Sequence, residues 1–250
     1  MADIAPLSLL RFVDTETTGF PPRAEMCEIG WTELMLYPEG WRITVDQQSA
    51  FVDPGHPIPA KCTEIHGITD EMVRGAMSPA EARAQLSRGA ALLAAHNVAF
   101  DRQFVRSPLP WICTLECARH VWPDAPNHKN ETLKEWLGIV VEGDAHRAGY
   151  DAAVSARIFL HLTKHLSIDD MLGLSDPGAV PLKMPFGAHK GKRFSDPTFP
   201  DSYLRWLVDH KDMRKGIKTA AQNEMNRRIA EKPAAPSRQP AKSSAWDRSF

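Results

Sequence analysis

The sequence contains few cysteines, no long hydrophobic run and almost no net charge. Its four cysteines lie at unrelated spacings in a chain of 250 residues, so we expect reduced thiols and no disulfide framework. The apolar stretch at residues 7–13 is too short to span a bilayer. The Met1 end lacks the order of basic, apolar and small residues that marks a signal peptide. We therefore expect a soluble, cytoplasmic protein.

Two of the cysteines share a regular spacing with a histidine. Cys113, Cys117 and His120 recur at i, i+4 and i+7, which is the spacing of one helix face. A structural zinc site needs four ligands, and no nearby residue obviously supplies the fourth. We interpret these three residues as part of a packed helix face.

The near-neutral total hides an uneven distribution of charge. Residues 1–181 contain 15 basic and 24 acidic residues, residues 182–230 contain 11 and 5, and residues 231–250 contain 4 and 2. An acidic front and a basic rear suggest that catalysis and the attraction of a polyanion are divided between the two parts.

Composition also predicts the organisation of the chain. With 43% apolar residues and seven tryptophans, the chain can bury a substantial core. We expect one main domain over residues 1–166, then a linker over 167–182 that is rich in Asp, Gly, Ser and Pro. A small basic module over 183–230 and a disordered tail over 231–250 complete the expected organisation.

Short apolar runs predict the strands of a mixed sheet. Residues 9–13, 26–34 and 49–52 have the pattern of an antiparallel meander, whereas 91–97 and 111–113 predict further strands that alternate with helices. Helices are expected over residues 63–69, 78–88, 99–105, 114–121, 132–139 and 148–165. The predicted class is therefore α/β, with a mixed central sheet (an antiparallel meander plus parallel strands) flanked by helices and followed by a small C-terminal module.

Two carboxylates end the first predicted strand. Asp14 and Glu16 are two residues apart, and this spacing places both side chains on one face of an extended chain. Two such charges repel each other unless a cation neutralises them, and hard oxygen ligands suit Mg²⁺ or Mn²⁺. A solvated strand end is the alternative interpretation of this pair alone.

Three further residues fall where a site of this kind would need them. Asp101 is expected in the first turn of a helix that follows the carboxyl end of a strand, where open α/β sheets place their sites. His146 and Asp151 are five residues apart, so on one continuous helix their side chains would diverge by about 140°. They can meet only if His146 lies on the loop before the helix.

Taken together, these residues resemble the three motifs of the DEDDh 3′→5′ exonucleases, a family of ribonuclease H-like fold. The matching segments are Asp14-x-Glu16-Thr17, His96-Asn97-x-x-Phe100-Asp101 and His146-x4-Asp151, and His66-Gly67-Ile68-Thr69 matches a substrate-contacting turn of the group. The likeness continues past the main domain toward the exonuclease X branch of the family, at Phe186-Gly187, Gly191-Lys192 and Tyr203-Leu204-Arg205-Trp206-Leu207. The segment Ala188-His189 departs from the basic-aromatic pair that is more frequent there.

The resemblance implies a metal-dependent nuclease that removes nucleoside 5′-monophosphates from 3′ ends. Four carboxylates (Asp14, Glu16, Asp101 and Asp151) would hold two Mg²⁺ ions, for which Mn²⁺ would substitute. His146 would be the general base, because the ordinary pKa of imidazole lies near neutral pH. The resemblance also implies that the terminal nucleotide is positioned by Thr17, His66, Asn97 and Phe100, although core packing explains Phe100 equally well.

The basic module is the remaining candidate for substrate binding. Lys190, Lys192 and Arg193 lie near aromatic residues and could contact phosphates while the rings stack on bases. The aromatic residues considered are Phe186, Phe194 and Trp206. Alternatively, the module is a structural cap with solvated charges.

The expected partner is DNA with a 3′ end, single-stranded or duplex. A 3′→5′ exoribonuclease acting on short RNA or tRNA ends stays open, because sequence does not locate contacts to a 2′-OH. A non-catalytic nucleic-acid-binding adaptor predicts the loss of at least one of the five motif residues, and all five are present. A homodimer and a protein partner for the tail are further hypotheses.

Overall fold

The structure is a computed structural model, and it describes residues 9–176, 183–184, 187–211, 213 and 215–231. Within these ranges, no helix is both long enough and apolar enough to cross a bilayer.

A five-stranded mixed sheet forms the centre of the main domain, with the strand order β3-β2-β1-β4-β5. The strands are β1 (Leu9–Thr17), β2 (Met26–Tyr37), β3 (Gly40–Phe51), β4 (Leu92–Ala95) and β5 (Trp111–Cys113). β1, β2 and β3 form the predicted antiparallel meander, and β4 and β5 run parallel to β1 and to each other. β3 begins at Gly40, earlier than the predicted start at residue 49. The prediction missed its first part because much of β3 is polar and exposed, so its sequence lacks the apolar signal of a buried strand.

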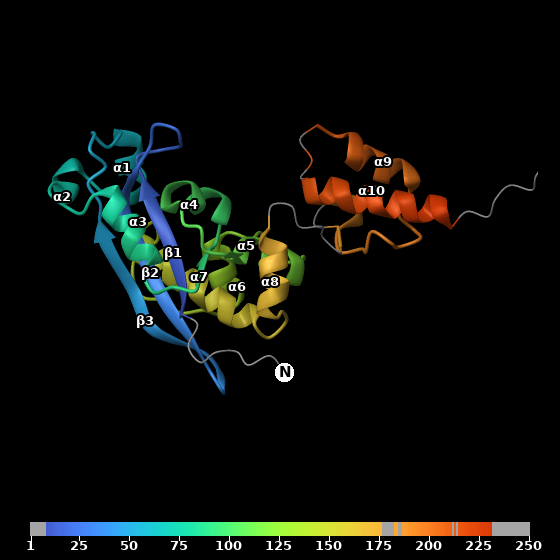
Figure 1. The fold of residues 1–250 in the computed structure, drawn as a ribbon, viewed down its shortest axis with the longest axis horizontal. Coiled ribbons are helices and arrows are strands. Elements are labelled where there is room, and N and C mark those ends of the chain that lie inside the picture. The colour runs from blue at the N-terminus through green and yellow to red at the C-terminus, as the bar shows by residue number, and fades with distance from the viewer. Residues whose placement is uncertain (1–8, 177–182, 185–186, 212, 214, 232–250) are drawn as a thin grey trace, which may run out of the picture.

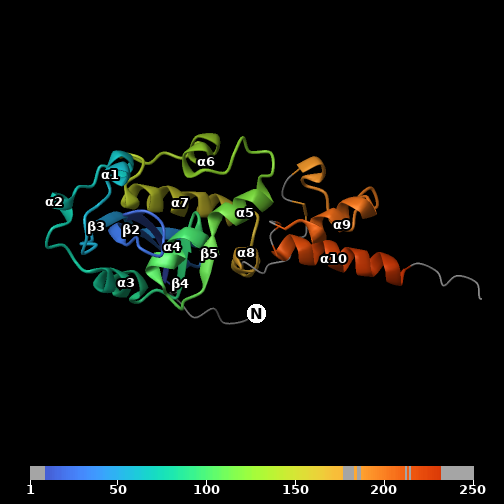
Figure 2. The ribbon, with the colours of Figure 1, turned by 90° about the horizontal axis from the view of Figure 1, so that it is seen from above.

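Helices cover both faces of this sheet (Figure 1). In the main domain they are α1 (Ala60–His66), α2 (Asp70–Val73), α3 (Pro79–Ser87), α4 (Val98–Val105), α5 (Thr114–Val121), α6 (Asn130–Trp136), α7 (Ala148–Leu162) and α8 (Ile168–Ser175). Figure 2 shows α7 on one side of the sheet and α3 and α4 on the other. The mixed sheet flanked by helices confirms the predicted fold class, and Ser78 and Glu81 form the predicted capping box of α3.

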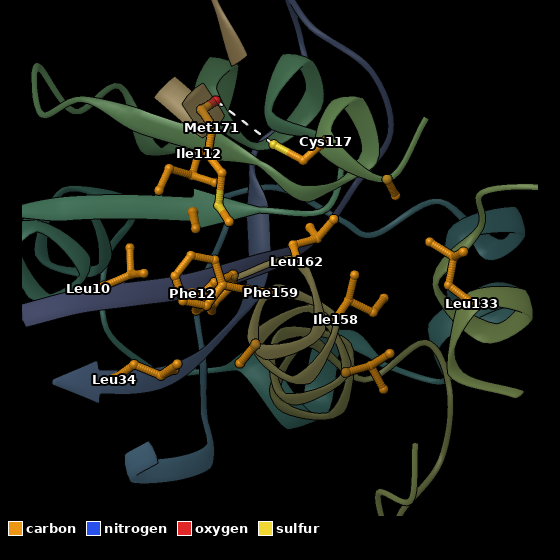
Figure 3. Close-up of a cluster of buried hydrophobic side chains, with 14 of the residues drawn as sticks. Leu10, Phe12, Leu34, Ile112, Cys117, Leu133, Ile158, Phe159, Leu162 and Met171 are labelled. Carbon is orange, nitrogen blue, oxygen red and sulfur yellow. Dashed lines mark hydrogen bonds between the residues drawn. The ribbon is translucent and has the colours of Figure 1, made fainter. Parts of the chain in front are cut away.

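The longest helix of the main domain, α7, lies directly on the meander. Phe12 of β1 and Phe159 of α7 pack with ring centroids 5.2 Å apart in a cluster of buried apolar side chains (Figure 3). A Cβ atom on Gly30 would lie 1.9 Å from the carbonyl carbon of Ala148, so only glycine allows the start of α7 to lie this close to β2. This contact brings the first turn of α7 beside the end of β1.

A helix occupies the start of the segment that was expected to be a linker. Ser167 and Asp170 form a capping box for α8, and Met171 on this helix is fully buried. The backbone amide of Cys113 donates a 2.7 Å hydrogen bond to Ser175 Oγ, which ties α8 to β5. Linker composition was misleading here because capping residues and linkers share Ser and Asp. The remainder of the expected linker (177–182) and most of the expected disordered tail (232–250) lie outside the described residues.

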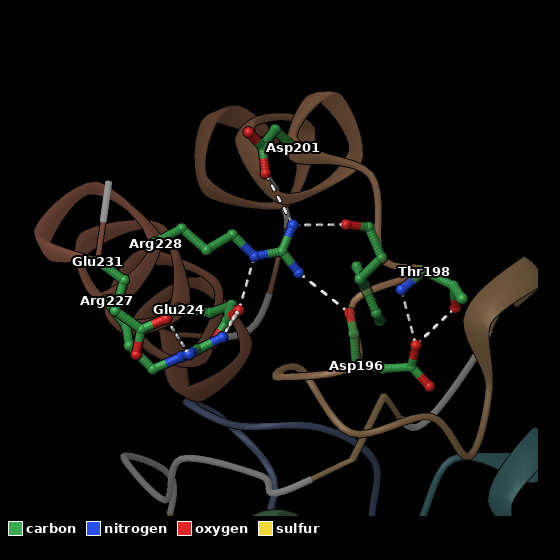
Figure 4. A network of polar contacts seen from close by, with 8 residues as sticks. Asp196, Thr198, Asp201, Glu224, Arg227, Arg228 and Glu231 are labelled. Carbon is green, nitrogen blue, oxygen red and sulfur yellow. Dashed lines mark hydrogen bonds and ion pairs between the residues drawn. The ribbon is translucent and has the colours of Figure 1, made fainter. Parts of the chain in front are cut away.

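The C-terminal module has its own small core. It contains a 3₁₀ turn (Gly187–His189), α9 (Asp201–Asp209) and α10 (Lys215–Ala230). Its buried apolar side chains include Met184, Phe199, Leu204, Leu207 and Ile217. Arg228 joins its parts by donating to Glu224, to Asp201 and to the carbonyls of Asp196 and Phe199 (Figure 4).

Of the three residues that were interpreted as one packed helix face, Cys117 and His120 lie on α5, whereas Cys113 is the last residue of β5 and directly precedes that helix. Cys117 is fully buried, with its Sγ 3.8 Å from the carbonyl oxygen of Met171. All four cysteines are free thiols.

Candidate active site

Three carboxylates converge between the end of β1 and the start of α7. Asp14 and Glu16 come from β1, and Asp151 comes from the first turn of α7. Each offers one ligand oxygen, and these oxygens lie within 4.8 Å of one another. The two-residue spacing on β1 thus places both strand carboxylates on the face that α7 covers. We refer to these three residues and Asp101 as the carboxylate cluster.

Asp101 reaches the cluster from the opposite face of the sheet. It is buried in the first turn of α4, after the carboxyl end of β4, as predicted. Thr15 Oγ1 donates a 2.9 Å hydrogen bond to Asp101 Oδ1. Thr15 lies between Asp14 and Glu16 on β1, so this bond fixes Asp101 to the strand that carries the other two acids.

The four carboxyl groups destabilise one another's charged forms. Burial, followed by the charges of Asp101, Asp151 and Glu16, raises the pKa of Asp14 well above its usual range. Burial also raises the pKa of Glu16 to about 8 and that of Asp101 to about 7, with the Asp151 charge acting in the same direction on both. The pKa of Asp151 is raised by burial, against the effect of its hydrogen bonds. Such a group of oxygen donors favours a divalent cation, which would neutralise the repulsion.

His146 lies on the loop before α7, as its spacing to Asp151 requires. Its backbone has φ of +64°, a left-handed conformation that folds the chain back over the first turn. Its backbone amide donates a 3.0 Å hydrogen bond to Asp151 Oδ2. The side chain is exposed, so solvent can reach the imidazole beside the carboxylates.

An ion pair with a buried carboxylate, which sequence reasoning missed, holds this loop in place. Glu28 on β2 is fully buried and accepts hydrogen bonds from Arg147 Nη2 (2.7 Å) and Nε (3.2 Å). The backbone amide of Ala148 donates to the same carboxylate at 3.0 Å. Glu28 therefore anchors the two residues that follow His146. The signal in the sequence was an acidic residue between the apolar residues Cys27 and Ile29 of a predicted strand, where a buried charge must be paired.

Asn130 is a second supporting residue that was missed. Its Nδ2 lies 3.3 Å from Asp151 Oδ1 and 3.2 Å from Ser155 Oγ. These bonds stabilise the charged form of Asp151 and orient it toward the cluster. Asn130 is the first residue of α6, and its position next to α7 depends on tertiary packing.

The residues assigned to the terminal nucleotide surround the end of β1. Thr17 is buried, and its Oγ1 donates to the carbonyl of Gly19 at 2.9 Å. His66 is buried behind it with a hydrogen bond to the Thr17 backbone, and burial lowers the pKa of its imidazole. Asn97 is exposed at the residue before α4. His66 thus supports Thr17 from within the protein, whereas Asn97 is open to solvent.

Phe100 lies between the core and an exposed ring. Its ring centroid is 5.2 Å from that of Phe104, which is buried, and 6.0 Å from that of Phe20. Phe20 is 81% exposed and follows Gly19 at the end of β1. One side of Phe100 therefore packs on the core, and its other side is near the exposed ring of Phe20. Sequence reasoning missed Phe20 as a candidate for stacking on a base.

The basic residues predicted to bind substrate lie in the C-terminal module, apart from the carboxylate cluster. Lys190 and Arg193 are exposed, and Lys192 Nζ donates to Thr198 Oγ1 at 3.0 Å. The expectation that Phe194 offers a stacking surface is wrong, because its ring is 5% exposed and packs on Phe199. Trp206 is 46% exposed and lies beside Tyr203, whereas Phe186 lies outside the described residues.

Known proteins are similar to this chain in sequence and in fold. A family model described as "Exonuclease" matches residues 12–159. Exodeoxyribonuclease 10 of Escherichia coli (strain K12) is 30% identical over 213 residues, which cover 82% of this chain and 92% of that protein. A DNA polymerase III subunit epsilon-like protein of Rhodobacter capsulatus is 35% identical over 191 residues, which cover 70% of this chain and 26% of that protein.

Solved structures of nucleases are similar to this chain in fold. Exonuclease X in complex with 5′ overhanging duplex DNA has a TM-score of 0.57 and 28% identity, and the match covers 66% of this chain and 98% of that one. Cell-death related nuclease 4 is similar in fold alone, with a TM-score of 0.50 and 15% identity.

Proposed function

The chain belongs to the exonuclease family and is a 3′→5′ exonuclease of the DEDDh type, and we propose that it releases nucleoside 5′-monophosphates from DNA with two Mg²⁺ ions and His146 as general base. The single observation that carries the proposal is the convergence of carboxylate oxygens within 4.8 Å, beside an exposed histidine on a constrained loop. DNA is the proposed substrate because one relative is named an exodeoxyribonuclease and the solved structure of exonuclease X is a complex with duplex DNA.

The enzyme depends on divalent metal, and the carboxylate cluster suits this requirement. Its raised pKa values have burial and mutual repulsion as their causes, and a bound cation relieves the repulsion. We assign the metal ligands to Asp14, Glu16, Asp101 and Asp151, with Mg²⁺ as the natural ion and Mn²⁺ as a substitute. When bound, such ions stabilise negative charge on the phosphoryl group and on the attacking and leaving oxygens.

The remaining chemistry belongs to residues around the cluster. His146 accepts the proton of the attacking water, which its exposure and its place on the loop before α7 permit. Arg147 and Glu28 hold this loop against β2, and Asn130 orients Asp151. The loop conformation is thus set before substrate arrives, which lowers the cost of placing the base.

The 3′-terminal nucleotide is proposed to lie along the end of β1. The backbone at Thr17 would contact its 3′ hydroxyl while His66 holds that backbone from behind. Asn97 would donate to the nucleotide from the start of α4. The exposed side of Phe100, extended by Phe20, would pack on the terminal base.

The C-terminal module, residues 183–230, is proposed as an additional DNA-binding unit that precedes the tail over 231–250, and we propose that the main domain extends beyond residues 1–166 to include α8, within the expected linker over 167–182. Residues 182–230 carry 11 basic against 5 acidic residues, and the Tyr203 and Trp206 rings lie 5.3 Å apart on its surface. The test is to change Lys190, Lys192 and Arg193 together to Gln and to measure single-strand affinity at several salt concentrations. The slope of log K against log[salt] should become shallower by about 2, because each lost phosphate contact removes about 0.7 from it. An unchanged slope would leave the module as a structural cap.

Three finer points stay proposals. A homodimer and a protein partner for the C-terminal tail are both testable by measuring mass in solution, alone and in mixtures. A cytoplasmic location suits the four free cysteines.

Digestion of end-labelled strands tests the proposed function directly. Single-stranded DNA, duplex DNA and RNA of one sequence are incubated with Mg²⁺, with Mn²⁺ or with chelator, and products are separated by length and identified by mass. We expect 5′-mononucleotides from DNA 3′ ends with either metal, no products in chelator, and none from the Asp151→Asn variant. Faster digestion of RNA than of DNA would reassign the substrate, and undiminished activity in chelator would reject the metal mechanism.

A further inference from the structure

A cavity lies beside the carboxylate cluster, between the carboxyl ends of β4 and β5 and the loop before α6. Its volume is about 520 Å³, and it is lined by His96, Asn97, Leu115, Arg119, Asn127, His128, Lys129 and Asn130. The reaction described above uses few of these residues. His96 belongs to the second motif and yet has no role in that reaction.

The cavity adjoins the carboxylate cluster at two points. Asn130, which lines the cavity, donates to Asp151 Oδ1 at 3.3 Å. Asn97 directly precedes α4, whose first turn carries Asp101. A strand whose last phosphodiester lies at the cluster therefore has this cavity next to it.

The wall of the cavity is fixed from within by His96. Its Nε2 lies 2.6 Å from the carbonyl oxygen of His128, so this nitrogen carries the proton, and its Nδ1 lies 2.9 Å from Thr114 Oγ1. Burial lowers the pKa of His96 to about 4, so the ring is neutral near neutral pH and makes one donor and one acceptor bond. His96 thus holds the loop before Lys129 in place, and the cavity is preformed.

The lining is cationic, in contrast to the neighbouring cluster. Arg119 and Lys129 supply positive charge, and amide groups come from Asn97, Asn127 and Asn130. In the described part of the chain, no carboxylate lines the cavity. Arg119 Nη1 donates a hydrogen bond to Glu116 Oε1 at 3.0 Å, and at 41% side-chain exposure the guanidinium has further N–H groups that can meet a ligand. Cations with amide donors match phosphate oxygens.

We propose that this cavity, the Arg119–Lys129 subsite, binds the phosphodiester backbone of nucleotides on the 5′ side of the one that is removed. The inference rests on the proposed function and adds to it a basis for preferring long strands over single nucleotides. The subsite supplies uniform binding, so its loss raises KM and leaves kcat nearly unchanged.

The test compares a strand with a substrate that has no upstream nucleotide. The full chain and its Arg119→Gln, Lys129→Gln and doubly substituted variants are assayed with Mg²⁺ on a single-stranded DNA 12-mer and on the p-nitrophenyl ester of thymidine 5′-monophosphate. Lys164→Gln, an exposed lysine just beyond α7, removes the same charge elsewhere and serves as the control.

We expect each single variant to raise KM for the 12-mer about tenfold, as the loss of a charge-assisted hydrogen bond does. Each should also flatten the salt dependence of 12-mer affinity by about 0.7. Hydrolysis of the ester, and all properties of Lys164→Gln, should match those of the unmodified chain.

Two results would overturn the subsite while leaving the proposed function intact. One is an unchanged KM and salt dependence for the 12-mer in the double variant. The other is an equal loss on the ester, which would place the effect in the reaction centre. Failure of the unmodified chain to cleave either substrate would instead reject the proposed function, and the subsite with it.

Discussion

Two groups of acidic residues can be compared, one around Glu224 in the C-terminal module and the other at the carboxylate cluster. Among the residues that the structure describes, arginines neutralise the first group but not the second. In the C-terminal module, buried Glu224 accepts hydrogen bonds from Arg227 and Arg228, and these lower its pKa (Figure 4). At the carboxylate cluster the pKa values are raised instead. Arg147 acts against this rise at Glu16, but it is bound to Glu28. An acidic group neutralised from within stabilises a fold, whereas one left unneutralised needs an ion from solution.

The largest effect should come from removing a cluster carboxylate. Asp14→Asn should lower kcat by more than about 100-fold, the upper end of what losing an outer-shell partner costs. Without metal the same variant should unfold at higher temperature, because one repelling charge is gone. Calorimetry in chelator and initial rates in Mg²⁺ measure the two effects, with exposed Glu39→Gln as the control. A metal-free stability lower than that of the unmodified chain would contradict this view of the cluster.

The second effect concerns the proposed general base. His146→Ala should lower kcat by roughly 10²–10⁴, the usual contribution of a general base, while Mg²⁺ affinity persists. The decline of rate toward acid pH should also change shape in the variant, because protonated imidazole cannot accept a proton. Rates measured from pH 5 to 9 decide the matter. If the two profiles superimpose after scaling, another group is the base.

A smaller effect should distinguish two glutamates of β2, each of which is paired with an arginine. Glu28→Gln weakens the anchor of the His146 loop and should lower kcat by about 10–100-fold. Glu33 is also on β2 and is paired with Arg11, away from the cluster, so Glu33→Gln should cost stability with little change in the kcat of folded protein. Steady-state rates and urea unfolding of both variants make the comparison. Equal losses of kcat would show that Glu28 acts through general stability.

In the C-terminal module, a change from Glu to Gln should affect the stability of the module and leave kcat unchanged. Glu224→Gln should weaken the module by roughly 1–3 kcal/mol, because hydrogen bonds to charged groups are lost. Glu231→Gln also removes a contact to Arg227, but its side chain is 62% exposed, so we expect about 0–1 kcal/mol. Hydrogen exchange of α10 amides reports the difference. Comparable protection in both variants would mean that the Glu224 network contributes little.

The smallest effect is on stability, which should change with pH in opposite directions at the carboxylate cluster and at Glu224 of the module. Glu16 has its pKa raised from 4.5 to about 8 in the metal-free fold, so its contribution to stability is present below pH 4.5 and is lost as pH rises toward 8. The pKa of Glu224 is lowered, so its contribution is lost as pH falls. Urea unfolding in chelator should show the main domain weakening from pH 5 to 8, and saturating Mg²⁺ should flatten this trend. A metal-free main domain that gains stability over this interval would refute it.

Local spacing in the sequence was enough to place the candidate residues relative to one another, and the resemblance of their motifs to a known family supplied the chemistry. The two-residue period of a strand places Asp14 and Glu16 on one face, and the helical period requires His146 to lie outside the helix that carries Asp151. These properties follow from backbone geometry over a few residues, so they can be read without the fold. The same is true of the capping box at Ser78.

Contacts between distant residues were decided only by the tertiary structure. Glu28 meets Arg147 across 119 positions of the chain, and the close contact of Gly30 with Ala148 depends on how α7 lies on β2. The Arg119–Lys129 subsite likewise exists because His96 fastens a loop 32 residues further along. Burial and pairing of this kind arise from the packing of whole elements, which no local pattern encodes. The sequence, with the family resemblance of its motifs, therefore identified the candidate reacting groups, and the fold determined what holds them and what lies beside them.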